Sequence, residues 1–103
     1  MEKSLSRLDF LTRIPNLKAF HEFGIKEIER CRRNNCKVAI AYMDCGNFKQ
    51  INDTFDHHVG NKLINTIAQT IQKSIRNVDV AARLSGDEFA IILPNTDTEA
   101  SNI

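Results

Sequence analysis

The sequence predicts an α/β (α+β) sandwich of ferredoxin-like topology, in which helices pack on a mainly antiparallel sheet. Apolar residues recur at helical spacing in two long segments, 17–34 and 59–76. Short apolar runs typical of strands cover 37–44, 79–84 and 88–93. A Ser-Gly-Asp turn joins the last two runs, which is a hairpin signal. These three observations together predict the class.

The first helix is expected to begin after Pro15, which interrupts the chain, with Asn16 as its cap. A shorter helix over 47–55 places Phe48, Ile51 and Phe55 on one face. Residues 94–103 are expected to open a further helix. The first eight residues are expected to be a tail.

From the first strand onward, the order of the predicted strands and helices matches a ferredoxin-like arrangement that lacks its last strand. In that topology the strand after the hairpin turn lies antiparallel between the other two. Asp44 ends the first strand, while Asp87 and Glu88 open the strand after the turn. Each acid taken singly is common in turns, but the topology brings all three to one edge of the sheet.

Composition indicates one small globular domain of 103 residues, 42% hydrophobic and 26% charged. A net charge of +1 gives no indication of electrostatic binding to a nucleic-acid polymer or a membrane surface. No apolar run approaches ~18 residues, and no signal peptide is visible. The three cysteines, Cys31, Cys36 and Cys45, lack metal-site spacing and are expected to be reduced thiols.

Three segments resemble the GGDEF domain of diguanylate cyclases: "DFLTRIPN" at 9–16, "FKQINDTFDHHVGN" at 48–61 and "SGDEF" at 85–89. The resemblance covers residues 9 to about 94, so 9–103 is interpreted as a partial GGDEF domain. It implies a palm-like nucleotidyl-cyclase fold. The family's final strand and its phosphate-holding segment are expected to be absent from this chain.

The resemblance implies that two GTP molecules condense into cyclic di-GMP, with release of pyrophosphate. It further implies two Mg²⁺ (or Mn²⁺) ions, a homodimer for catalysis, an upstream sensor domain and a cytoplasmic location. The implied metal ligands are Asp44, Asp87, Glu88 and the backbone carbonyl of Cys45. Asp87 and Glu88 are also the implied catalytic residues.

The resemblance places the substrate against the residues Phe48, Lys49, Asn52, Asn61, Ser85 and Gly86. Backbone amides of residues 45–48 are expected to face phosphate oxygens, and Asn52 to contact guanine and ribose. Lys49 is either a phosphate contact or a surface charge. Arg76 and Asp79, in R-x-x-D spacing, match the family's inhibitory site for cyclic di-GMP, although the same pattern is typical of a helix-end ion pair.

Several residues depart from the family pattern. Ser85 replaces the first glycine of the signature and adds a Cβ near the phosphates. Asn61 replaces an aspartate, so one guanine donor loses its acceptor and base choice becomes less certain. Asp56 replaces a turn glycine, which costs strain if φ is positive there. Arg13, also at a glycine position, is expected to matter less.

Three alternatives to a working cyclase stay open. A degenerate domain could bind cyclic di-GMP without making it, or bind GTP to regulate an attached domain. A plain ferredoxin-like interaction domain would bind no nucleotide at all.

Overall fold

The structure, a computed structural model, describes residues 6–46 and 48–95. Helix α1 spans Leu17–Asn34, as predicted. The side-chain oxygen of Asn16 accepts a hydrogen bond from the Ala19 amide at 3.0 Å, which satisfies one of the unpaired donors of the first turn. The helix ends at Asn35, whose left-handed backbone (φ 57°) turns the chain toward the sheet.

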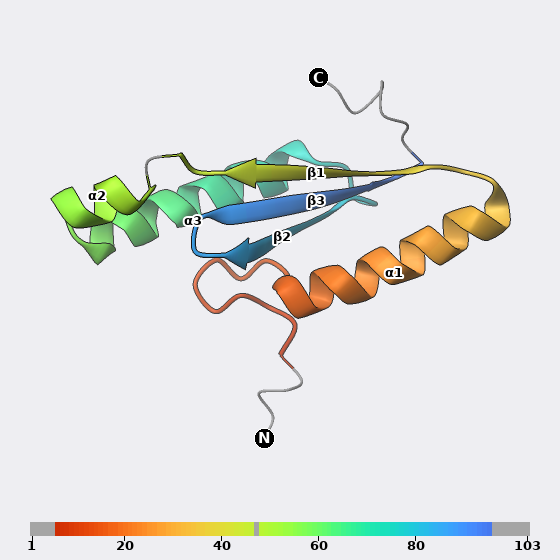
Figure 1. The fold of residues 1–103 in the computed structure, drawn as a ribbon, viewed down its shortest axis with the longest axis horizontal. Helices are drawn as coiled ribbons and strands as arrows, with labels where there is room; N and C mark the ends of the chain where they lie inside the picture. Colours follow the sequence, from red (N-terminus) through yellow and green to blue (C-terminus); the bar gives the residue numbers. More distant parts are fainter. Residues whose placement is uncertain (1–5, 47, 96–103) are drawn as a thin grey trace.

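The sheet contains three antiparallel strands in the order β1-β3-β2 within the described residues. Strand β1 spans Val38–Asp44, β2 spans Val80–Ser85 and β3 spans Glu88–Pro94. The predicted central position of the strand after the hairpin turn is therefore confirmed. Figure 1 shows the carboxyl end of β1 and the β2–β3 turn at the same end of the sheet.

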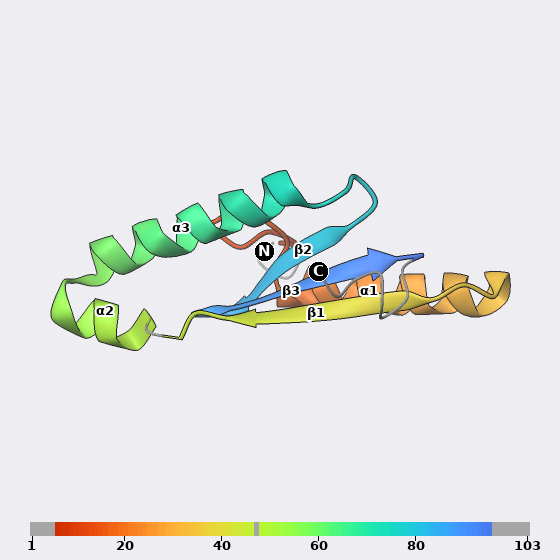
Figure 2. The same cartoon turned by 90° about the horizontal axis from the view of Figure 1, so that it is seen from above.

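Two apolar clusters hold helices against opposite faces of the sheet. Ile64, Ala68 and Ile71 of helix α3 pack with Ala81 and Phe89 of the strands. On the other face, the cluster contains Phe20, Ala82, Ala90 and Ile92. Neighbouring strand residues alternate between the two clusters, as the period of two requires. The sandwich class is confirmed, and Figure 2 shows α3 crossing above the strands.

Helix α2 spans Phe48–Thr54 and helix α3 spans His57–Ser74. The prediction of 59–76 for the longer helix is wrong by two residues at each end. Asp56 causes the earlier start, because its carboxylate accepts a hydrogen bond from the Val59 amide at 3.0 Å and caps the helix. The backbone of Asp56 is extended (φ −175°), so replacement of a glycine there carries no strain.

Residues 6–16 form an ordered turn that leads into α1. Leu8 pairs with Pro15 in an isolated bridge, and Thr12 and Ile14 are buried. Arg13 has a positive φ of 65°, which favours glycine. Of the helix predicted for 94–103, only Pro94 and Asn95 lie within the described residues, and neither is helical: Pro94 ends β3, and Asn95 has a left-handed backbone (φ 58°).

The prediction of three reduced cysteines is wrong for Cys31 and Cys36, which form a disulfide, and confirmed for Cys45, which is free. The spacing of the cysteines did not predict this pairing, because the pairing depends on the left-handed backbone of Asn35, which turns Cys36 back toward Cys31. Across the described part of the chain, none of the helices has both the length and the apolar character needed to cross a membrane.

Candidate active site

The predicted convergence of three acidic residues is present at one end of the sheet. Asp44 and Glu88 are paired across β1 and β3. The Cys45 amide donates a hydrogen bond to the backbone carbonyl of Asp87 at 3.0 Å, which extends the pairing beyond the strand end. The strand register therefore fixes the backbone that carries each acid.

The negative charges of Asp44, Asp87 and Glu88 repel one another at this end of the sheet. The charge of Asp87 is the largest cause that raises the pKa of Asp44 above its ordinary value. Partial desolvation, a hydrogen bond with Asp87 and the charge of Glu88 act in the same direction. Asp44 and Glu88 are exposed and Asp87 is half-buried, so a ligand can reach them from solvent. Repulsion between these carboxylates therefore disfavours the ionised form of Asp44.

The chemistry of Asp44 and Asp87 fits a hard divalent cation. Carboxylate oxygens are the ligands that Mg²⁺ prefers, and Mg²⁺ typically takes one or two carboxylates together with waters and phosphates. A cation would also relieve the repulsion that raises the pKa of Asp44. Within residues 6–46 and 48–95, however, no three His, Cys, Asp or Glu side chains gather closely enough to bind a metal by themselves.

Two backbone amides in the loop after β1 donate hydrogen bonds within the protein. The Phe48 amide donates to the Cys45 carbonyl at 3.2 Å, and the Cys45 amide is bonded to Asp87. The prediction that amides 45–48 all face phosphates is therefore wrong for residues 45 and 48, because the turn closes on itself. The Cys45 carbonyl keeps a second lone pair. Burial, followed by the charges of Asp87 and Asp44, raises the pKa of the Cys45 thiol.

Ser85 contacts a carboxylate within the turn. Its hydroxyl donates a hydrogen bond to Glu88 Oε1 at 2.7 Å. The two residues are paired at a register shift between Arg83 and Ser85, which places them side by side. Besides the added Cβ, Ser85 thus supplies a hydroxyl that orients Glu88. Neither Gly86 nor any other described glycine has a positive φ.

Arg83 was not predicted as a site residue, yet it fixes the shape of the turn. Its guanidinium donates to the Gly86 carbonyl at 2.8 Å and to the Ser85 carbonyl at 3.3 Å. It also contacts the Asp9 carboxylate at 3.2 Å. Both side chains of this ion pair are largely buried.

Two signals could have found Arg83. It lies two residues before the signature turn, and Asp9 opens the first of the three motif segments. A cavity of about 540 Å³ is lined by Asp9, Arg83 and the turn residues Ser85 and Gly86. The ion pair thus joins the N-terminal motif to the signature turn.

The residues predicted to bind the nucleotide base lie on α2 and α3. The Asn52 side-chain oxygen is buried and has no hydrogen-bond partner among the described residues. A Cβ placed on Gly60 would overlap this carboxamide, so Gly60 makes room for it. Asn61 follows directly and is exposed, as is Lys49. Asn52 thus lies against the turn of α3 that carries Asn61.

The Phe48 side chain packs inside the protein, next to the candidate site. Its ring packs against the apolar cluster under α3 and lies within 3.9 Å of where a Cβ on Gly86 would be. The structure therefore places the Phe48 ring between α3 and the signature turn.

Arg76 and Asp79 form the helix-end ion pair that their spacing allows. Arg76 Nη2 lies 2.7 Å from Asp79 Oδ1, and the Arg76 amide donates to Asp79 Oδ2 at 2.8 Å. The Asp79 side chain is 2% exposed, whereas that of Arg76 is 51% exposed. The hydrogen bond to Asp79 is the main cause that raises the pKa of Arg76.

Comparisons with known proteins identify the family and the fold of the chain. Residues 6–103 match the family model described as "Diguanylate cyclase, GGDEF domain". The chain is 30% identical, with a TM-score of 0.88, to the GGDEF domain of DgcB from Caulobacter crescentus, solved in complex with c-di-GMP. That alignment covers 91% of this chain and 55% of the solved one.

Two curated relatives come from Pseudomonas aeruginosa. Diguanylate cyclase DgcP is 39% identical over 92 residues, covering 89% of this chain and 14% of the relative. Cyclic di-GMP phosphodiesterase NbdA is 33% identical over 101 residues, covering 98% of this chain and 13% of the relative. The chain therefore spans a small part of the length of either relative.

Proposed function

The chain belongs to the diguanylate cyclase GGDEF domain family, and from this premise we propose that it binds GTP and a divalent cation at the acidic end and condenses two GTP molecules into cyclic di-GMP. The observation that carries the proposal is the register that pairs Asp44 with Glu88, beside Asp87. The similarity to DgcP supports the same activity.

Asp44 and Asp87 would hold the cation, with the Cys45 carbonyl as a further oxygen ligand. Bound Mg²⁺ or Mn²⁺ neutralises charge at the α-phosphate and increases the acidity of the attacking hydroxyl. Two ions per site are part of the proposal. Asp87 and Glu88 are the proposed catalytic residues, and the Ser85 hydroxyl keeps Glu88 beside the turn. Arg83 holds the turn itself in shape.

The base would be recognised between α2 and α3. The unpartnered oxygen of Asn52 is the group that most needs a donor, and guanine offers N1–H and N2–H donors. Asn61 presents one acceptor and one donor where a carboxylate would present two acceptors. We expect weaker discrimination between GTP and ATP than a carboxylate would give.

Product binding is proposed at Arg76 and Asp79. The half-exposed guanidinium of Arg76 can approach guanine O6 and N7, while buried Asp79 fixes its direction. Catalysis is proposed to need a homodimer, since each of two GTP molecules attacks the other. An upstream sensor domain and a cytoplasmic location, where GTP is available, complete the proposal.

The test is incubation of the chain with GTP and Mg²⁺, followed by chromatography of the nucleotides. Formation of cyclic di-GMP and pyrophosphate supports the proposal. If GTP binds in calorimetry but remains intact at every protein concentration, the proposed turnover fails and the chain is a GTP-binding module.

A receptor role is the second candidate, favoured by the DgcB structure with c-di-GMP. Calorimetry with cyclic di-GMP tests it. We expect Arg76→Ala to weaken binding, while the control Arg32→Ala, an exposed arginine at the end of α1, leaves it unchanged. Equal affinity for cyclic di-GMP in both variants would show that Arg76 does not contribute to the binding site.

A further inference from the structure

The end of the sheet opposite the acidic residues carries the disulfide between Cys31 and Cys36. Both residues belong to the turn that ends α1. The Asn35 and Cys36 amides both bond to the Cys31 carbonyl, the latter at 3.0 Å. In such helix ends, the residue after the left-handed position contacts the side chain near the end of the helix. Here these two positions are both cysteines.

Backbone hydrogen bonds therefore bring the cysteines together whether or not the sulfur atoms are joined. Their Cα atoms are 4.7 Å apart, within the range that a disulfide requires. Loss of the bond leaves the turn in place, because the Asn35 and Cys36 amides keep their acceptor. The pair can change oxidation state without refolding.

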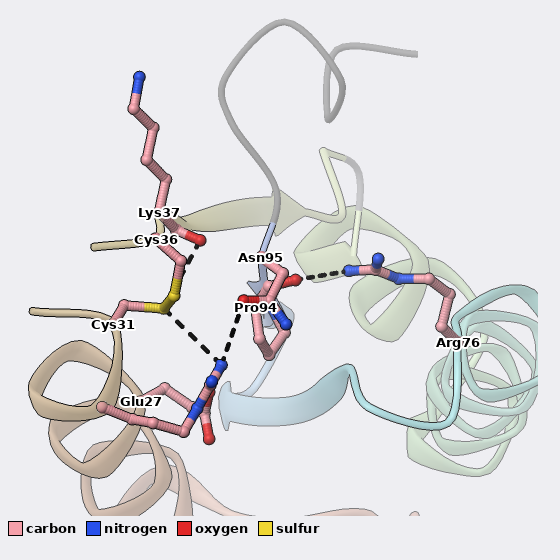
Figure 3. The surroundings of a disulfide bond; sticks show 8 residues. Glu27, Cys31, Cys36, Lys37, Arg76, Pro94 and Asn95 are labelled. Atoms are coloured by element: carbon pink, nitrogen blue, oxygen red, sulfur yellow. Dashed lines mark hydrogen bonds and ion pairs between the residues drawn. A yellow bond between two sulfur atoms is a disulfide. The ribbon is translucent and has the colours of Figure 1, made fainter. Parts of the chain in front are cut away.

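The surroundings also suit the reduced form. Cys31 Sγ lies 3.7 Å from the Lys37 carbonyl, a distance at which a thiol can donate a hydrogen bond and a disulfide cannot. The Arg30 guanidinium donates toward the same sulfur at 3.7 Å. Figure 3 shows the disulfide beside the Lys37 carbonyl. A positive charge at this distance favours the thiolate form of reduced Cys31.

A groove gives access to the pair. It has a volume of about 320 Å³ and is lined by both cysteines, Arg32 and apolar residues of α1 and β1. Cys31 is only 4% exposed, whereas Cys36 is half-buried. Between residues 30 and 37 the chain has basic side chains and no acidic one: Arg30, Arg32, Arg33 and Lys37. Two acids, Glu27 and Glu29, precede this stretch, and Glu27 is paired with Arg30 at 2.9 Å.

We propose that Cys31 and Cys36 are a reversible redox-modification site that exchanges with small thiols and disulfides bearing carboxylates, of which glutathione is the probe. The Cys36 thiolate attacks one sulfur of glutathione disulfide and releases one glutathione. The Cys31 thiol then loses its proton to solvent, and its thiolate attacks the Cys36 sulfur and expels the second glutathione. Two protein thiols are oxidised, and one external disulfide is reduced to two thiols.

The pairing is tested by counting thiols. The reduced chain is equilibrated with glutathione and glutathione disulfide at several ratios, quenched with acid, alkylated and weighed by mass spectrometry. We expect three alkylated cysteines under reducing conditions and one, Cys45, under oxidising conditions, with full return when glutathione is restored. Three alkylated thiols at every ratio, a disulfide involving Cys45, or a disulfide that glutathione does not reduce would overturn the proposal.

The order of attack is tested by trapping. Cys31→Ser should accumulate glutathione on Cys36, whereas Cys36→Ser should react at least several-fold more slowly because Cys31 is buried. Cys45→Ser is the control and should still form the disulfide. Equal trapping in the first two variants would overturn the assignment of Cys36 as the first thiol. Circular dichroism checks that each variant keeps its helices, and none of these outcomes depends on cyclase activity.

Discussion

The two ends of strand β1 differ in what determines their geometry. At the acidic end, defined by Asp44, Asp87 and Glu88, residues distant in the sequence meet through strand pairing. At the cysteine end, defined by Cys31 and Cys36, residues five apart meet through one helix-ending turn. The strand between them has seven residues, so about 20 Å separates the ends.

This difference determines which changes each end tolerates. The acidic end concentrates like charge, which raises the pKa of Asp44, and its geometry depends on the register of β3. At the cysteine end, the turn is held by two backbone hydrogen bonds to the Cys31 carbonyl, which do not involve the sulfur atoms. Function that needs a ligand is therefore expected at the first end, and modification without refolding at the second.

The largest expected effect comes from Asp44→Asn. Cyclic di-GMP formation should fall ~100-fold or more, because charge stabilisation by a metal contributes several kcal/mol and 1.4 kcal/mol is a factor of ten. In the absence of metal, the thermal midpoint should rise, since repulsion from Asp87 is removed. The exposed acid Asp53, on α2, gives the matched control Asp53→Asn, which should change neither quantity. Unchanged activity in Asp44→Asn would break the comparison.

The next effect tests what holds the acidic end in shape. Arg83→Ala removes the contacts to Ser85 and Gly86 and leaves the largely buried Asp9 carboxylate without its positively charged partner. Urea unfolding should show a loss of about 2–4 kcal/mol. Arg7→Ala is the control, since Arg7 pairs with Glu22 in an exposed ion pair and should cost at most about 1 kcal/mol. Equal losses would show that the turn does not depend on Arg83.

A smaller effect should appear on acidification. Burial alone would raise the pKa of Asp9, but hydrogen bonds from Thr12 and Arg83, with the Arg83 charge, hold it below the ordinary value. A lowered folded-state pKa gives stability that is present above about pH 4 and is lost as the pH falls through the folded value. Asp9→Asn should therefore lose stability at pH 7 and show a flatter dependence between pH 5 and 2 in urea unfolding. Parallel curves for both proteins would contradict the assignment.

The smallest expected effect is a gain. Arg13 has a φ of 65°, a conformation that costs a non-glycine residue roughly 1 kcal/mol. Arg13→Gly should raise the free energy of unfolding by up to about that amount. Asn35→Gly, at a φ of 57°, is the control and should gain less, because asparagine tolerates this region. A loss of stability in Arg13→Gly would mean that the arginine side chain makes a stabilising contact.

The sequence predicted the elements well where periodicity and caps coincide. Asn16 and the apolar stripe gave the bounds of α1, and the hairpin turn gave the strand order that brings Asp44 to Glu88. The start of α3 was missed because Asp56 was interpreted as a strained replacement for glycine rather than as a helix cap. Caps and turns look alike in sequence because the same polar residues serve both.

Contacts between segments that are distant in the sequence were not predicted. The ion pair between Arg83 and Asp9 joins residues 74 apart, and no local pattern encodes it. The cysteine pair depends on the left-handed backbone of Asn35, which an asparagine permits but does not require. The burial of the Asn52 oxygen against Gly60 follows from the packing of α2 on α3. Each needs the tertiary arrangement, which composition and spacing leave open.

The most direct test of the acidic end is paramagnetic broadening of amide NMR signals by Mn²⁺, with and without GTP. We predict that residues 44–46 and 85–88 broaden first and more strongly with GTP, while residues 31–36 at the cysteine end stay sharp. Asp44→Asn should abolish the effect, and Asp53→Asn should preserve it. Broadening that centres elsewhere, or that survives in Asp44→Asn, would contradict the account.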